Sequence, residues 1–153
     1  MPDTYTQLNI HVVFVVKNRA NVLQPYFKPR LCEYLCGILR NHKHYPLAIN
    51  GYYDHIHVFF EMHPAMALSD IVCELKSSSS KWINDNNMLP GKFRWQDGYG
   101  GFSYSRSQRD RVIKYILNQE KHHERITFRE EYLAILKAFK IEFKEQYLFD
   151  FLE

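Results

Sequence analysis

The alternation of two hydrophobic periodicities along the chain constrains its fold most. Residues 5–16 (YTQLNIHVVFVV), 46–53 and 54–62 are rich in β-branched and aromatic residues, a composition typical of strands. Residues 28–43 and 67–85 instead carry apolar side chains at helical spacing, and in 67–85 the apolar stripe stays in phase through a run of four serines. The sequence therefore predicts three strands and two helices in the order strand–helix–strand–strand–helix.

The remainder of the chain adds a strand and further helices. Residues 93–105 (FRWQDGYGGFSYS) are expected to form a loop and a strand. Ser107–Asp110 and Thr127–Glu130 resemble capping boxes, so we expect helices to begin at both, the second running to about residue 139. This order predicts an α+β fold of the ferredoxin-like or RNA-recognition-motif-like type, with an antiparallel sheet packed with helices. We expect one domain over residues 1–153.

Composition narrows the class of protein. The 153 residues are 46% hydrophobic and 24% charged, which excludes a disordered chain. Apolar runs are too short for a membrane span and the first residues lack a signal-peptide core, so we expect a cytoplasmic protein without membrane contact. The net charge of +3 permits nucleic-acid binding. Cys32 and Cys36, four residues apart, could hold a metal or be buried thiols.

The stretch Asp54-His55-Ile56-His57-Val58-Phe59-Phe60 carries two histidines in a predicted strand. Successive strand residues point to opposite faces, so His55 and His57 project to the same face. Two imidazoles about 7 Å apart along a strand can reach one metal ion or one phosphate. A half-exposed strand that happens to contain two histidines is the alternative.

The helix expected after Ser107 offers partners for this pair. Tyr115, Gln119 and His122 lie at i, i+4 and i+7 and so face one side of a helix. A glutamine carbonyl oxygen is a suitable third ligand for Mg²⁺ or Mn²⁺. A tyrosine beside a metal-bound phosphate can attack phosphorus and form a phosphotyrosine. With eleven tyrosines in the chain, the spacing could also be accidental.

Several residues are candidates for contact with DNA. Cations follow the first strand and flank the serine run, while aromatic residues alternate with glycines in residues 93–105, an arrangement that could stack on unpaired bases or form a packed turn. The candidates are Lys17, Arg19, Lys76, Lys81, Trp95, Tyr99 and Tyr104.

The sequence resembles the single-tyrosine HUH transposases (TnpA-like) of small bacterial insertion sequences and their REP-associated tyrosine transposase relatives. Four segments carry the resemblance, which extends from about residue 4 to residue 143: HVVFVVKNR (11–19), DHIHVFF (54–60), WQDGYGGFSYS (95–105) and YILNQEKHH (115–123). The histidine pair alone is a weak signal, but the combination of all four in this order is specific.

The resemblance implies a function. His55 and His57 match the metal ligands of the family, Tyr115 its nucleophile and Gln119 its third ligand. It implies a homodimer that binds hairpins at the ends of an element and cuts single-stranded DNA with Mg²⁺ or Mn²⁺, leaving a 5′-phosphotyrosine. It assigns no role to His122 and His123, for which packing and a phosphate contact both stay open.

Two alternatives remain. A non-catalytic module that binds single-stranded nucleic acid would suit the aromatic residues, the charge and the fold class. A domesticated HUH nuclease acting on repeated palindromes would keep the chemistry in a host role. A histidine-triad hydrolase is disfavoured because Phe59 stands where a third histidine is needed.

Overall fold

A four-stranded antiparallel sheet forms the centre of the computed structural model, which describes residues 3–19, 21–144 and 148. The sheet has the order β2-β3-β1-β4, with both central strands paired antiparallel to their neighbours. This is the sheet order of a split β-α-β arrangement, and the α+β prediction is confirmed. The strands are β1 (Asn9–Val15), β2 (Tyr45–Tyr52), β3 (His55–Glu61) and β4 (Gly100–Tyr104).

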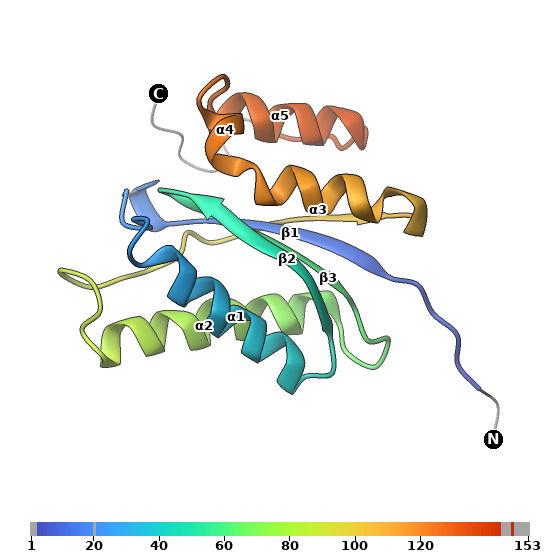
Figure 1. Cartoon of the computed structure of the whole chain (residues 1–153), viewed down its shortest axis with the longest axis horizontal. Coiled ribbons are helices and arrows are strands. Elements are labelled where there is room, and N and C mark those ends of the chain that lie inside the picture. The colour runs from blue at the N-terminus through green and yellow to red at the C-terminus, as the bar shows by residue number, and fades with distance from the viewer. Residues whose placement is uncertain (1–2, 20, 145–147, 149–153) are drawn as a thin grey trace.

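Helices cover both faces of the sheet (Figure 1). On one face lie α1 (Lys28–Asn41) and α2 (Leu68–Asp85). On the other lie α3 (Arg109–Leu117), α4 (Gln119–His123) and α5 (Phe128–Ala138). Short 3-10 turns, η1 (Lys17–Arg19) and η2 (Arg106–Gln108), follow β1 and β4.

Among the helices within residues 3–19, 21–144 and 148, none is both long enough and apolar enough to cross a bilayer.

Strand alternation divides the side chains of β1 and β3 between two different environments. Val12, Phe14, Ile56 and Val58 face α1 and α2 and form the main hydrophobic core with them. The opposite face carries three buried histidines, His11, His55 and His57, beneath the C-terminal helices. Because β1 and β3 are central strands covered on both sides, even these histidines are inaccessible to solvent.

The start and the course of α3 differ from the sequence prediction. The capping box consists of Ser105 and Gln108, not Ser107 and Asp110, and it opens η2 before α3 begins. The helix then ends at Leu117, so Tyr115 and Gln119 lie on two successive helices. The Asn50 side chain on β2 donates hydrogen bonds to the carbonyls of residues 116 and 117, at 3.1 and 3.2 Å. These bonds satisfy carbonyls that would otherwise continue the helix.

The serine run permits a close contact between α2 and the loop before β4. The buried Ser79 hydroxyl accepts a hydrogen bond from the Trp95 indole at 2.9 Å. Lys76 donates to the carbonyls of Gln96 and Gly98 at 2.6 and 2.9 Å. Ser79 and Lys76 of α2 therefore anchor the glycine-rich loop to the main core.

Gly51 allows β2 to approach β3 where the first histidine lies. A β-carbon at Gly51 would overlap the carbonyl oxygen of His55, whereas one at Gly37 on α1 would meet no atom within 4 Å. We expect Gly51→Ala to lower the free energy of unfolding by about 1–3 kcal/mol. Gly37→Ala should raise it by about 0.5–1 kcal/mol. Urea titrations of both variants test this, and equal stability of the two would contradict the packing described.

Candidate metal centre and active site

The two histidines of β3 are fixed from behind by buried partners. His55 Nδ1 donates to Asp54 Oδ1 at 2.8 Å, which leaves the Nε2 lone pair free to face the interior of the site. His57 Nδ1 lies 2.7 Å from Nε2 of His11, and one proton is shared between the two rings. The Phe128 ring stacks on His55 with centroids 3.9 Å apart. Such outer contacts set the tautomer and ring orientation of a metal-ligating histidine.

A carboxylate that sequence reasoning missed lies at the centre of the site. Glu131 on α5 is only 2% exposed, and its Oε1 lies 3.2 Å from His57 Nε2 and 3.6 Å from His55 Nε2. The sequence does contain a signal for it. Glu131 lies in phase with Phe128, Tyr132 and Ile135 on the apolar face of α5, where an acidic residue is unexpected.

Tyr115 and Gln119 reach the same carboxylate from α3 and α4. The Tyr115 hydroxyl donates to Glu131 Oε2, and Gln119 Nε2 donates to the same oxygen at 3.1 Å. The structure thus brings together Tyr115, Gln119 and both histidines, despite the helix break that the sequence did not predict. Glu131 directs one oxygen to the histidines and the other to the tyrosine.

The nitrogen and oxygen atoms that face the interior of the site are suitable ligands for a metal ion. His55 Nε2 faces two oxygens, Gln119 Oε1 at 3.3 Å and Glu131 Oε1 at 3.6 Å. Because His55 already donates through Nδ1, these lone pairs converge without a proton between them, as expected where a cation binds. One ligand atom each from His55, His57 and Glu131 lies within 4.8 Å of the others. Imidazole and carboxylate together suit Mn²⁺ and similar divalent ions.

Burial and charge set the protonation of the site. Burial lowers the pKa of His55 to about 4, so this ring is neutral and able to ligate at pH 7. Burial alone would raise the pKa of Glu131, but the charge of His57 and the contacts with His122 and His123 outweigh it and hold the carboxylate ionised. Burial, and then the adjacent Glu131, raise the pKa of Tyr115, so its hydroxyl stays protonated and donates.

His122 and His123, to which the sequence assigned no role, both lie against the carboxylate. His123 Nε2 is 3.1 Å from Gln119 Oε1 and 3.4 Å from Glu131 Oε1, while its Nδ1 bonds the Ile126 carbonyl at 3.0 Å. His122 Nε2 is 3.1 Å from Glu131 Oε2 but does not have hydrogen-bonding geometry. These two histidines close the site on the α4 side.

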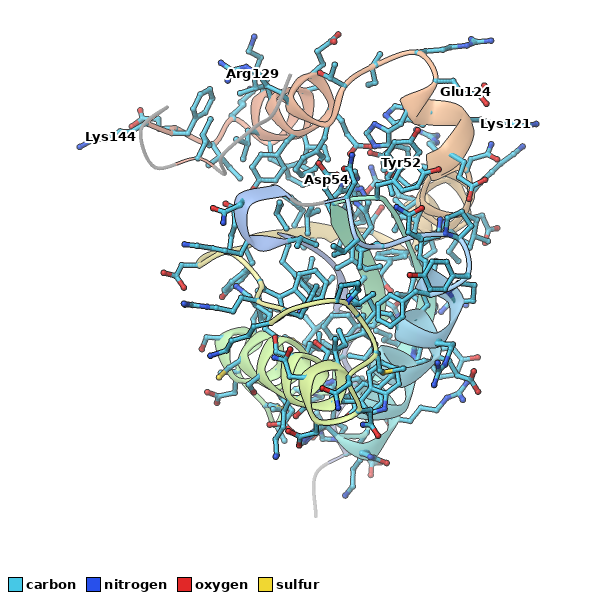
Figure 2. The ribbon with its side chains drawn as sticks, turned by 90° about the vertical axis from the view of Figure 1, so that its left-hand side faces the viewer. Tyr52, Asp54, Lys121, Glu124, Arg129 and Lys144 are labelled. Atoms are coloured by element: carbon cyan, nitrogen blue, oxygen red, sulfur yellow. The ribbon has the colours of Figure 1, made fainter. Side chains whose placement is uncertain are left out.

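The site opens to the surface beside Tyr115. A hollow of about 460 Å³ is lined by Tyr104, Tyr115, His122 and Glu131. A second hollow, of about 670 Å³, shares Tyr115 and His122 and adds Lys121, Arg125 and Glu124. In Figure 2, Lys121 points outward from α4, while Asp54 and Tyr52 lie at the end of the sheet below it. A DNA strand that passes over Tyr115 would therefore meet two cations and one carboxylate on this side.

The candidate DNA contacts are dispersed. Tyr104 lines the hollow beside Tyr115, and Tyr99 is partly exposed in the loop before β4. Trp95 is 4% exposed, packs edge-on against Phe14 and Phe93, and presents no open ring face, so its stacking on DNA is not supported.

The cations among these candidates have different surroundings. Lys17 is exposed in η1, whereas Lys76 is held by loop carbonyls and Lys81 pairs with Asp85 at 2.6 Å. Arg19 ends η1, but its side chain lies outside the described part of the structure. Cys32 and Cys36 are half-buried thiols, and burial raises the pKa of Cys32 to about 11.

Comparison with known proteins identifies the family. The sequence profile of the family "Transposase IS200 like" matches residues 4–119, so the chain belongs to the IS200-like transposase family. A search of curated proteins finds no significant match. Glu131, His122 and His123 lie beyond the matched residues.

Two solved structures have similar folds. A candidate transposase from Deinococcus radiodurans is 22% identical, with a TM-score of 0.62 over 78% of this chain and 95% of that one. A REP-associated tyrosine transposase bound to a REP hairpin is 16% identical, with a TM-score of 0.57 over 80% of this chain and 73% of that one. At these identities the likeness supports the fold.

Glu131→Gln tests the carboxylate as a ligand. The substitution keeps the size of the side chain but removes its charge, so we expect Mn²⁺ affinity measured by calorimetry to fall at least about tenfold. Glu33→Gln, on the exposed surface of α1, is the matched control and should leave the affinity unchanged. An unaltered affinity in Glu131→Gln together with a loss in Gln119→Leu would instead assign the third ligand to the amide.

Proposed function

We propose that the chain is a metal-dependent single-stranded DNA endonuclease and strand transferase in which Tyr115 is the nucleophile. The observation that carries the proposal is the sharing of one buried carboxylate. Glu131 Oε2 accepts the Tyr115 hydroxyl, and Oε1 faces the two histidines expected to bind the metal. The Glu131 carboxylate therefore contacts the proposed nucleophile through one oxygen and the proposed metal ligands through the other.

The residues divide the reaction between them. The Tyr115 oxygen attacks the scissile phosphorus, its proton passes to Glu131 Oε2, and the bond from phosphorus to the 3′ oxygen breaks. The departing oxygen takes up a proton from water, and the proton on Glu131 returns to the resulting hydroxide, which gives a free 3′-hydroxyl, a 5′-phosphotyrosine and the original carboxylate. Mg²⁺ or Mn²⁺ held by His55, His57 and Glu131, with Gln119 beside them, would polarise the phosphate and favour the tyrosinate. In the reverse step, a 3′-hydroxyl attacks the phosphotyrosine and rejoins DNA without ATP.

The proposed substrate is single-stranded DNA with a hairpin, held by a homodimer. Support comes from family membership and from a fold relative whose structure contains a REP hairpin. Lys121 and Arg125 beside Tyr115 provide positive charge for backbone phosphates. A protein that only bound single strands would have no use for a buried carboxylate between a tyrosine and two histidines, which favours catalysis over the binding-module alternative.

Covalent capture tests the nucleophile. The protein is incubated with Mn²⁺ and with 5′- and 3′-labelled single strands that carry hairpins from the DNA flanking its gene. We expect a protein–DNA band on a denaturing gel that carries the label 3′ of the cut. The band should be absent with EDTA and in Tyr115→Phe, while Tyr99→Phe, at an exposed tyrosine in the loop before β4, should retain it. Binding without linkage under either metal would overturn the proposal in favour of the binding module.

Mixing two inactive variants tests which subunit supplies the tyrosine. Tyr115 contacts the carboxylate of its own chain, and its ring centroid lies 5.9 Å from that of His57 in the same chain. We therefore expect Tyr115→Phe mixed with His57→Ala, after subunit exchange, to remain inactive. Recovery of up to about a quarter of the wild-type cleavage rate would show instead that the tyrosine acts across the dimer, since about half of the dimers are then mixed and each has one complete site of two.

A further inference from the structure

A hollow separate from the tyrosine site lies where β1 leaves the sheet. It has a volume of about 340 Å³ and is bounded by the end of β1 with η1, and by residues 89–94. Its apolar wall consists of the half-buried Val22 and the edges of the buried side chains of Leu89 and Phe93. Lys17, Lys92 and Arg94 contribute charge at its edge. A volume of this size accommodates a small organic ligand.

The charge around this hollow is unbalanced. Its lining contains three cations and no acidic residue. Within the described ranges, Lys17, Lys92 and Arg94 form no ion pair with an acidic side chain. Lys28, by contrast, pairs with Glu120 at 3.2 Å. All three side chains at the hollow are exposed. Unneutralised cations beside an apolar wall favour a ligand that carries both negative charge and an apolar ring.

The walls of the hollow are held by specific hydrogen bonds. The Lys17 amide donates to the Arg94 carbonyl at 2.9 Å, joining η1 to the loop. The Asn84 side chain, on the last turn of α2, accepts from the Phe93 amide at 2.8 Å and donates to its carbonyl at 3.0 Å. Asn18 takes a left-handed conformation, with φ of 60°, that turns the chain at the rim. The hollow is therefore formed before any ligand arrives.

This hollow also lies at the end of the sheet that carries the metal centre. Val15 pairs with His55 across the sheet, and the next residue, Val16, donates its amide to the Asp54 carbonyl at 2.9 Å. Asp54 is the residue whose carboxylate orients His55. The same few residues therefore connect the hollow to the proposed site of cleavage.

We infer that the hollow binds one unpaired nucleotide of the DNA strand, with its base against the apolar wall and its phosphates on Lys17, Lys92 and Arg94. The inference rests on the proposed function, because it takes the ligand to be a segment of the same substrate. Single-strand binding proteins combine base contact with a cationic track in this way. The hollow then holds the strand at a fixed distance from Tyr115.

Binding measured in a Tyr115→Phe background tests the inference without cleavage. The probes are a fluorescent twelve-nucleotide oligothymidylate and an abasic strand of the same length, followed by anisotropy over a range of salt concentrations. Lys92→Ala/Arg94→Ala should weaken oligothymidylate binding roughly tenfold at low salt and lower the salt slope by about 1.4, since each single-strand phosphate contact contributes about 0.7.

A matched double variant controls for loss of charge. Arg40→Ala/Lys43→Ala removes two exposed cations near the start of β2, where Tyr45 pairs with Glu61 at the opposite end of the sheet. This pair should leave affinity and salt slope unchanged. An equal loss in the two double variants would overturn the inference, because the effect would then reflect net charge alone.

Val22→Trp separates base recognition from charge, because it fills the hollow and keeps every cation. It should abolish the preference for oligothymidylate over the abasic strand, while a preserved preference would overturn the inference. Thermal unfolding checks that the variant folds, and Val22→Phe repeats the test with a smaller side chain if it does not. Because Tyr115→Phe cannot form the covalent link, failure of wild-type cleavage would count against the proposed function and leave these binding results standing.

Discussion

The burial of the Glu131 carboxylate is the constraint on which the C-terminal half of the structure depends. A charge removed from water costs several kcal/mol unless partners replace its hydration. Here Tyr115, Gln119, His57, His122 and His123 surround the two carboxylate oxygens. Those partners come from β3, α3 and α4, so the charge can be accommodated only when all these elements are in place around α5.

The packing of α5 against the sheet both stabilises the fold and positions the Glu131 carboxylate. Phe128 and Tyr132 on α5 pack with Val13, Val15 and Phe102 of the sheet, while Glu131 between them enters the polar site. The helix is therefore held by apolar burial on both sides of the carboxylate. Packing of this kind fixes the position of a catalytic group more firmly than a loop would, since the rotamer of Glu131 is determined by its neighbours.

Local patterns in the sequence account for the sheet and the histidines but not for the completed site. Alternation along residues 54–62 was enough to place His55 and His57 on one face, because strand geometry depends only on the local backbone. Glu131 could not be assigned in the same way, since its contact with β3 depends on how α5 packs. The helix break after Leu117 was not predicted for a similar reason: the side chain that bonds the carbonyls at the break, Asn50, lies 66 residues earlier in the chain than Ile116.

The position of the site at one end of the sheet also has a physical basis. Strand β3 begins at His55, directly after Asp54, so the first ligand lies where the sheet gives way to turns. Turns and helix ends at that edge leave side chains such as Lys17, Lys121 and Arg125 exposed. Within the strands, by contrast, His11 is completely buried and contacts the ligand His57 from behind. A long polyanion can approach only the edge of the sheet, whereas the ligand geometry must be fixed by the interior. The start of β3 meets both requirements, because the buried His55 lies directly beside the turns that carry the exposed cations.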